Sequence, residues 1–141
     1  MALLIDASVF ITLERRGGSP GEIQSLAPDE LLGIASITAV ELLTGVRRAN
    51  TPERRDRRGA YVEALFLLIP IIHFELTAAR LLAHIWADLA ARGTPIGPYD
   101  SVVAVTALAN GFEVFTDNID EFSRVPGLVV RQPDWPEQAK V

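Results

Sequence analysis

The sequence contains no cysteine, two histidines and one lysine. Without cysteine, the chain has no disulfide bond, no thiolate nucleophile and no cysteine-based metal site. His73 and His84 are too few and too badly spaced for a zinc site. The one lysine, Lys140, stands at the chain end, whereas a phospho-receiver site needs a lysine opposite its acids. A glycine-rich phosphate loop of the P-loop type is also missing.

Long apolar runs are missing as well. The longest, residues 64–72, is interrupted by Pro70 and falls short of the ~20 residues that span a bilayer. The first residues include the acidic Asp6 and no basic residue, unlike a secretory signal. We therefore expect a cytoplasmic protein that does not associate with membranes.

Positive charge is scarce but concentrated. The net charge of −5 disfavours a purely electrostatic nucleic-acid binder. Half of the twelve arginines nevertheless fall in one short stretch: Arg47, Arg48, Arg54, Arg55, Arg57 and Arg58. Arginine is suited to bidentate contact with phosphate or carboxylate. The stretch is either such a contact surface or simply a solvated helix face.

The order of apolar and helical patterns predicts an α/β fold. With 141 residues and 49% apolar composition, one globular domain is expected, over residues 1–135, followed by a short polar tail at 136–141. Short apolar runs predict strands at 3–5, 31–35, 71–74, 112–115 and 128–130. Helical spacing and caps predict helices at 7–15, 20–27, 38–49, 52–69, 75–92 and 100–110, and a turn or short helix at 117–122. Alternating strands and helices indicate a mostly parallel sheet with helices on both faces.

Four acids stand at or near predicted helix starts: Asp6, Glu41, Asp100 and Asp117. Singly, each is explained as a carboxylate that faces a helix N-terminus. For Glu41 the explanation is specific, because Thr38 lies three residues earlier, as in a capping box. Together they suggest more, since Asp6 and Asp117 follow strands and project at the same edge of a parallel sheet. Asp100 joins them only if its helix start leans over that edge.

Converging carboxylates raise each other's pKa, and a hard divalent cation relieves their repulsion. Mg²⁺ and Mn²⁺ prefer oxygen ligands. A metal-bound water is a nucleophile near neutral pH, and metal ions stabilise in-line displacement at phosphorus. If the acids converge, they therefore indicate metal-dependent phosphodiester chemistry.

Four motifs in order carry a resemblance to a known family. The sequence resembles the PIN-domain ribonucleases, and within them the VapC toxins of toxin–antitoxin pairs. The match runs from about residue 3 to 135, and its motifs lie at 4–9, 36–45, 96–100, and 116–118 together with 122–128. The resemblance implies a three-layer α/β/α sandwich with a mostly parallel central sheet and the acids in one pocket.

The resemblance also implies the site residues. Asp6, Glu41 and Asp100 match the first three family acids, and Asp117 is favoured as the fourth, with Asn118 and Asp120 as competitors. Asp6, Asp100 and Asp117 are the expected metal ligands. The hydroxyls of Ser8 and Thr116 either assist the site through hydrogen bonds or simply cap helices.

The function implied is that of a toxin: an endoribonuclease that cleaves RNA with Mg²⁺, or Mn²⁺, through a metal-activated water. The implied partners are RNA, a VapB-type antitoxin and a second copy of the chain. Four arginines are expected to contact the RNA or the antitoxin: Arg47, Arg48, Arg54 and Arg55. The alternatives are a PIN-like binding module that acts mainly in an antitoxin and operator-DNA complex, and a nuclease that acts on DNA. The RNA target, the number of metal ions, the antitoxin and the dimer surface stay open.

Overall fold

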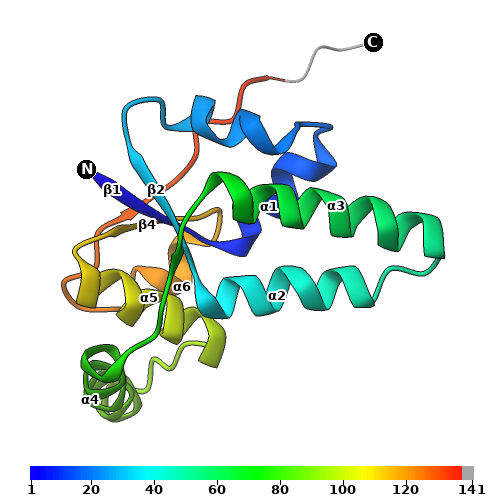
Figure 1. The fold of residues 1–141 in the computed structure, drawn as a ribbon. Helices are drawn as coiled ribbons and strands as arrows, with labels where there is room; N and C mark the ends of the chain where they lie inside the picture. The colour runs from blue at the N-terminus through cyan, green and yellow to red at the C-terminus, as the bar shows by residue number, and fades with distance from the viewer. Residues whose placement is uncertain (138–141) are drawn as a thin grey trace.

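A parallel sheet of five strands forms the centre of the protein (Figure 1). We describe its structure from a computed structural model covering residues 1–137; the rest of the predicted tail, residues 138–141, lies outside the described residues. The strand order is β3-β2-β1-β4-β5, and every pair of neighbours is parallel. The strands are β1 (Ala2–Ile5), β2 (Leu31–Ala35), β3 (Ile71–Ile72), β4 (Glu113–Phe115) and β5 (Val130–Arg131). The predicted α/β fold with a parallel sheet is confirmed.

Helices cover both faces of the sheet. They are α1 (Ala7–Arg15), the 3₁₀ helix η1 (Pro20–Leu26), α2 (Ser36–Arg47), α3 (Pro52–Leu68), α4 (Leu76–Arg92), α5 (Pro98–Asn110) and α6 (Ile119–Phe122). Side chains alternate across a strand, so Leu3 and Ile5 join the core under α1 and α3, whereas Leu4 joins the core under α4 and α5. Burial on both faces explains why β1 reads as a continuous apolar run. In Figure 1, α2 and α3 form a hairpin that projects to one side of the sheet.

Two helices begin two residues earlier than predicted. Helix α2 begins at Ser36 with Ala35 as its N-cap, so Thr38 and Glu41 lie inside the helix and the predicted capping box is wrong. The helix starts directly at the end of β2, which leaves no loop in which Thr38 could cap it. Helix α5 begins at Pro98, two residues before Asp100, because proline suits the first helical position.

The fold collects several chain segments at one edge of the sheet. In a parallel sheet the carboxyl ends of β1, β2 and β4 share an edge, and α1 and α2 start there. The backbone N–H of Asp6 donates to the carbonyl of Phe115 over 2.9 Å, so the residue after β1 is tied to the end of β4. Within residues 1–137, no helix has both the length and the apolar character required to span a membrane.

Candidate active site

Asp6 stands at the centre of this edge, almost fully buried with 4% of its surface exposed. Its Oδ2 accepts hydrogen bonds from Ser8 Oγ over 2.7 Å and from Thr116 Oγ1 over 2.9 Å. One hydroxyl comes from α1 and the other from the end of β4. Two donors on one oxygen fix the orientation of the carboxylate, and neither uses Oδ1.

The segment that follows β4 is held by the same two hydroxyls. The N–H of Asp117 donates to Ser8 Oγ over 3.1 Å, and the N–H of Asn118 donates to Thr116 Oγ1 over 2.9 Å. Ser8 and Thr116 therefore act on the carboxylate of Asp6 and on the backbone of residues 117–118 at once. The assisting role of the two hydroxyls in the reaction stays a prediction.

Asn118 connects this segment to α5. Its Nδ2 donates to Oδ2 of Asp100 and to Oε2 of Glu121, each over 3.1 Å. The other oxygen of Glu121, Oε1, accepts a hydrogen bond from the backbone N–H of Gly97, the N-cap of α5. The start of α5 thus leans over the sheet edge and is fastened there by side chains from the β4–α6 region.

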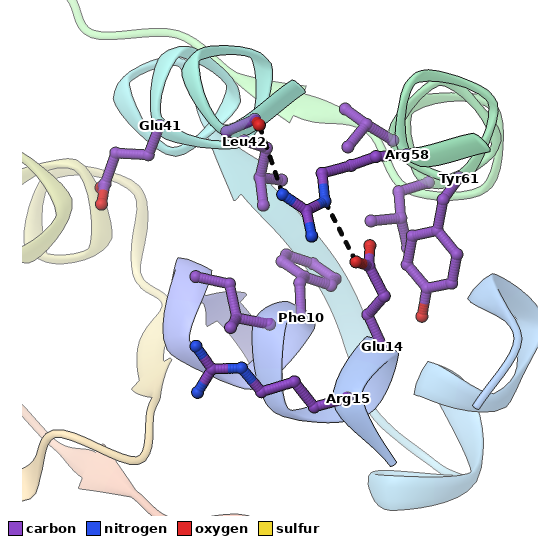
Figure 2. Close-up of a pocket in the computed structure, with 11 residues that line it drawn as sticks. Phe10, Glu14, Arg15, Glu41, Leu42, Arg58 and Tyr61 are labelled. Atoms are coloured by element: carbon purple, nitrogen blue, oxygen red, sulfur yellow. Dashed lines mark hydrogen bonds and ion pairs between the residues drawn. The ribbon is translucent and has the colours of Figure 1, made fainter. Parts of the chain in front are cut away.

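Glu41 reaches the site from α2. Its carboxylate points away from Arg58 and the neighbouring groove in Figure 2. Its Oε1 is buried and has no hydrogen-bond partner within the described residues. Burial, and secondarily the negative charge of Asp6, raise the pKa of Glu41 to about 7. Glu41 is therefore a carboxyl without a hydrogen-bond partner in the described residues, and the charge of Asp6 raises its pKa.

The neighbouring acids also raise the pKa of Asp100. Burial, the hydrogen bond with Glu121 and the charges of Asp6, Glu121 and Glu41 raise the pKa of Asp100 to about 7. The pKa of Glu121 is lowered instead, chiefly by the Gly97 N–H that it accepts. Asp100 is thus within electrostatic reach of three carboxylates from separate chain segments: Asp6, Glu41 and Glu121.

These residues fit a hard divalent cation. All candidate donors are oxygens, and like charges in partial burial favour binding of a cation. The unpartnered Oε1 of Glu41 is a further acceptor for a metal-bound water. Within residues 1–137, no three His, Asp or Glu side chains form a ready set of ligands. Mg²⁺ is commonly held by one or two carboxylates plus waters, so a complete protein cage is not required.

The candidates for the fourth acid differ in orientation. The carboxylate of Asp117 accepts from Thr12 Oγ1 and from Trp135 Nε1, each over 2.8 Å, on the side of α1 and the C-terminal segment. The side chain of Asp120 is exposed. Glu121, which the sequence reasoning missed, is the acid beside Asp100. Its signal was available: it lies three residues after Asn118, the N-cap of α6, on the same side of that short helix.

The arginines gather on the α2–α3 hairpin, away from the acids. Arg47, Arg48, Arg54 and Arg55 are exposed. Arg58 instead forms an ion pair with Glu14 of α1 at 3.2 Å and lines a groove of about 210 Å³ between α1, α2 and α3 (Figure 2). Glu41 also lines this groove, whose apolar walls include Phe10 and Leu42. The groove thus lies between Arg58 of α3 and the part of α2 that carries Glu41.

Comparison with known proteins identifies similar sequences and structures. The PIN domain family model matches residues 3–128. A tRNA(fMet)-specific endonuclease VapC of Salmonella typhimurium is 39% identical over 72% of this chain and 74% of its own length. A protein of the same name from Shigella flexneri is 32% identical over 96% of this chain and 98% of its own length. The crystal structure of DNA-bound VapBC from Salmonella typhimurium superposes with a TM-score of 0.81 at 31% identity, over 94% of this chain and 98% of that one.

Proposed function

The chain belongs to the PIN domain family, and within it to the VapC proteins, and we propose that it is a toxin that cleaves RNA at the acidic edge of its sheet. One observation carries the proposal. Asp6, Glu41 and Asp100 come from distant parts of the chain, yet they lie close enough that the charge of Asp6 raises the pKa of both other carboxyls. Carboxylates kept together at such an electrostatic cost indicate a site for a cation rather than a stabilising network.

Asp6 and Asp100 are the proposed ligands of Mg²⁺ or Mn²⁺. A bound cation would supply an activated water and neutralise charge on the phosphate. Ser8 and Thr116 orient Asp6, and Asn118 and Glu121 support Asp100. We assign the fourth acidic position to Glu121 in preference to Asp117 or Asp120, because Glu121 is the one beside Asp100.

Glu41 is the proposed general base. Its Oε1 is buried and has no other partner within the described residues, so it is free to accept a hydrogen bond from the attacking water. In this role it would take the proton of the attacking water. A purely structural role does not explain this carboxyl, because a buried acceptor without a hydrogen-bond donor destabilises the fold.

The proposed substrate is transfer RNA. Both named relatives are tRNA(fMet)-specific endonucleases, which makes initiator tRNA the first substrate to test. The exposed arginines of the α2–α3 hairpin would contact RNA phosphates at a distance from the acidic site, and so hold a backbone that the acids themselves repel. An elongator methionine tRNA is the matched comparison substrate.

The proposed partners are a VapB-type antitoxin and a second copy of the chain. The similar structure is a DNA-bound VapBC, which supports assembly with an antitoxin at DNA. Exposed apolar side chains support dimerisation: Leu67 is 89% and Leu76 is 63% exposed. Light scattering of the purified protein gives the oligomeric state directly.

The test is cleavage of initiator tRNA by purified protein, free of antitoxin, with Mg²⁺ or Mn²⁺. We expect cleavage that EDTA stops and that the Asp6→Asn variant lacks. Equal activity of Asp6→Asn and the parent protein would point to a contaminating nuclease and contradict the proposal. DNA of the same sequence, tested in parallel, decides between an RNase and a DNase.

A second candidate function, favoured by the DNA-bound similar structure, is a binding module with little nuclease activity. Expression without antitoxin separates the two. Growth arrest that the Asp100→Asn substitution relieves supports the nuclease. Arrest that survives this substitution supports binding alone.

A further inference from the structure

Helix α1 carries a polar stripe that holds two other chain segments. Ser8, Thr12 and Arg16 follow one another at intervals of four residues, so they lie on one side of the helix. Ser8 contacts the segment after β4, and Thr12 donates to Asp117. Arg16 donates to the carbonyl of Pro136 and lies 5.3 Å from the centre of the Trp135 ring. The stripe therefore links α1 to residues 116–118 and to residues 135–136.

Asp117 is the meeting point of these segments. Its Oδ2 accepts from Thr12 and its Oδ1 accepts from the indole N–H of Trp135, each over 2.8 Å. Trp135 is partly buried and packs against the core that contains Phe10. The C-terminal segment thus lies across α1 as a strap, and Asp117 is its anchor.

The residues on either side of Asp117 both hold site carboxylates. Thr116 donates to Asp6, and Asn118 donates to Asp100. A displacement of this three-residue segment would therefore move two carboxylate-orienting groups together. The anchor restrains the segment at its middle residue, between the two.

We propose that Asp117, held by Thr12 and Trp135, is a positioning residue that keeps Thr116 and Asn118 in place against Asp6 and Asp100. The proposal rests on the nuclease function proposed above. Both carboxylate oxygens of Asp117 are occupied on the side of α1 and the strap, so its charge is not what the site uses. The side chain at position 117 is instead required to form both hydrogen bonds, one with Thr12 and one with Trp135.

Two substitutions at Asp117 separate the effect of its hydrogen bonds from the effect of its negative charge. Asp117→Asn keeps an acceptor for Trp135 and offers its amide to Thr12, so both hydrogen bonds can form. Asp117→Ala removes both. We expect Asp117→Asn to retain kcat within about threefold and Asp117→Ala to lose about 10- to 100-fold with little change in KM, since an ~1 Å misplacement of catalytic groups has effects of this size.

The strap supplies a readout that does not depend on activity. The chain has two tryptophans, and Trp86 is an exposed residue of α4, so Trp86→Phe leaves Trp135 as the only reporter. In that background, with no metal added, Asp117→Ala should shift Trp135 emission to longer wavelength and increase its quenching by acrylamide. Asp117→Asn should leave both unchanged.

Each outcome decides the proposal. Loss of cleavage in Asp117→Asn with unchanged Trp135 emission makes the carboxylate itself catalytic and overturns the positioning role. Unchanged kcat in Asp117→Ala with shifted emission overturns it as well, because the strap then has no link to the site. If Asp117→Ala does not fold, Thr12→Val and Trp135→Phe, which each remove one hydrogen bond, must each lower kcat. A parent protein without Asp6-dependent cleavage overturns the nuclease proposal itself, which is a distinguishable result.

Discussion

The side-chain amide of Asn118 donates a hydrogen bond to Oδ2 of Asp100 over 3.1 Å. It joins the segment after β4 to a helix that precedes β4 in the chain, and so brings Asp100 to the edge where Asp6 stands. An uncharged amide suits this position, because Asp100 already feels the charges of Asp6, Glu41 and Glu121. A donor at this point orients the carboxylate without adding to the repulsion.

The first prediction concerns Glu121. The Glu121→Ala substitution removes the acceptor of the Gly97 N–H and a partner of Asn118, so the start of α5 should lose its fixed position. We expect cleavage to fall about tenfold or more, as for other losses of catalytic geometry. Asp120→Asn is the matched control, because its side chain is exposed one residue away, and it should change the rate less than about twofold. Equal effects of the two variants on cleavage of initiator tRNA would contradict the assignment.

The second prediction concerns pH. The pKa of Glu41 is raised from its ordinary value of 4.5 to about 7, so between these pH values the folded protein binds more protons than the unfolded chain. The free energy of unfolding of metal-free protein should therefore fall as pH rises from about 4.5 to 7, by on the order of 1–2 kcal/mol after allowance for solvent screening. Urea unfolding at several pH values, in EDTA, measures this slope.

The Glu41→Gln substitution is the control for that slope. It removes the titrating group and its repulsion with Asp6, so the pH dependence should become shallower and the protein more stable near pH 8. Asp100 titrates in the same direction and will leave a residual slope. A slope that is unchanged in Glu41→Gln would show that this carboxyl does not titrate in the window.

The third prediction concerns metal binding. Mg²⁺ or Mn²⁺ should raise the thermal unfolding temperature near pH 8, because a ligand at ~100 times its Kd stabilises by about 2.7 kcal/mol. The effect should shrink near pH 5.5, where protons compete for Glu41 and Asp100. Differential scanning fluorimetry with Asp6→Asn as control measures it. A metal response that Asp6→Asn retains in full would place the ion elsewhere.

The fourth prediction concerns the arginines. Binding of RNA is measured in the Asp6→Asn background, which prevents cleavage. Arg47→Ala and Arg54→Ala should each weaken binding, and each should reduce the slope of log affinity against log salt by about 0.7–0.9 for every phosphate that the variant no longer neutralises. Arg92→Ala is the control, because Arg92 lies on α4 and pairs with Asp88. If all three variants share the parent's salt dependence, the hairpin does not bind RNA.

The fifth prediction concerns the sheet. A Cβ at Gly33 of β2 would lie 2.8 Å from Ile72 Cγ1 and 3.2 Å from Phe112 Cε1. Gly33→Ala should therefore destabilise the protein by about 1–3 kcal/mol through overpacking. At Gly59, inside α3, a Cβ would lie 3.5 Å from Val46 Cγ1, an ordinary packing distance, so Gly59→Ala should instead stabilise by up to about 1 kcal/mol. Chemical denaturation of the pair measures both, and a tolerated Gly33→Ala would mean that Ile72 moves aside.

Much of the local structure followed from residue pattern alone. The apolar runs predicted β1 and β2. The proline at residue 52 marked the beginning of α3, and the glycines at residues 93 and 111 marked the C-terminal ends of α4 and α5. These signals are local, because a cap or a turn depends on residues close in sequence. The same reasoning failed at Thr38, whose spacing to Glu41 imitates a capping box, because the end of β2 leads straight into α2.

By itself, the sequence determined the α/β class, the parallel sheet and the position of Asp6 and Asp100 at helix starts. Tertiary structure alone decided which other side chains join them. It turned Asp117 toward Thr12 and Trp135, and it placed Asn118 and Glu121 beside Asp100. The physical reason is that sequence spacing defines the face of an element on which a residue lies. How the start of α5 leans over the sheet edge depends instead on packing between segments far apart in the chain.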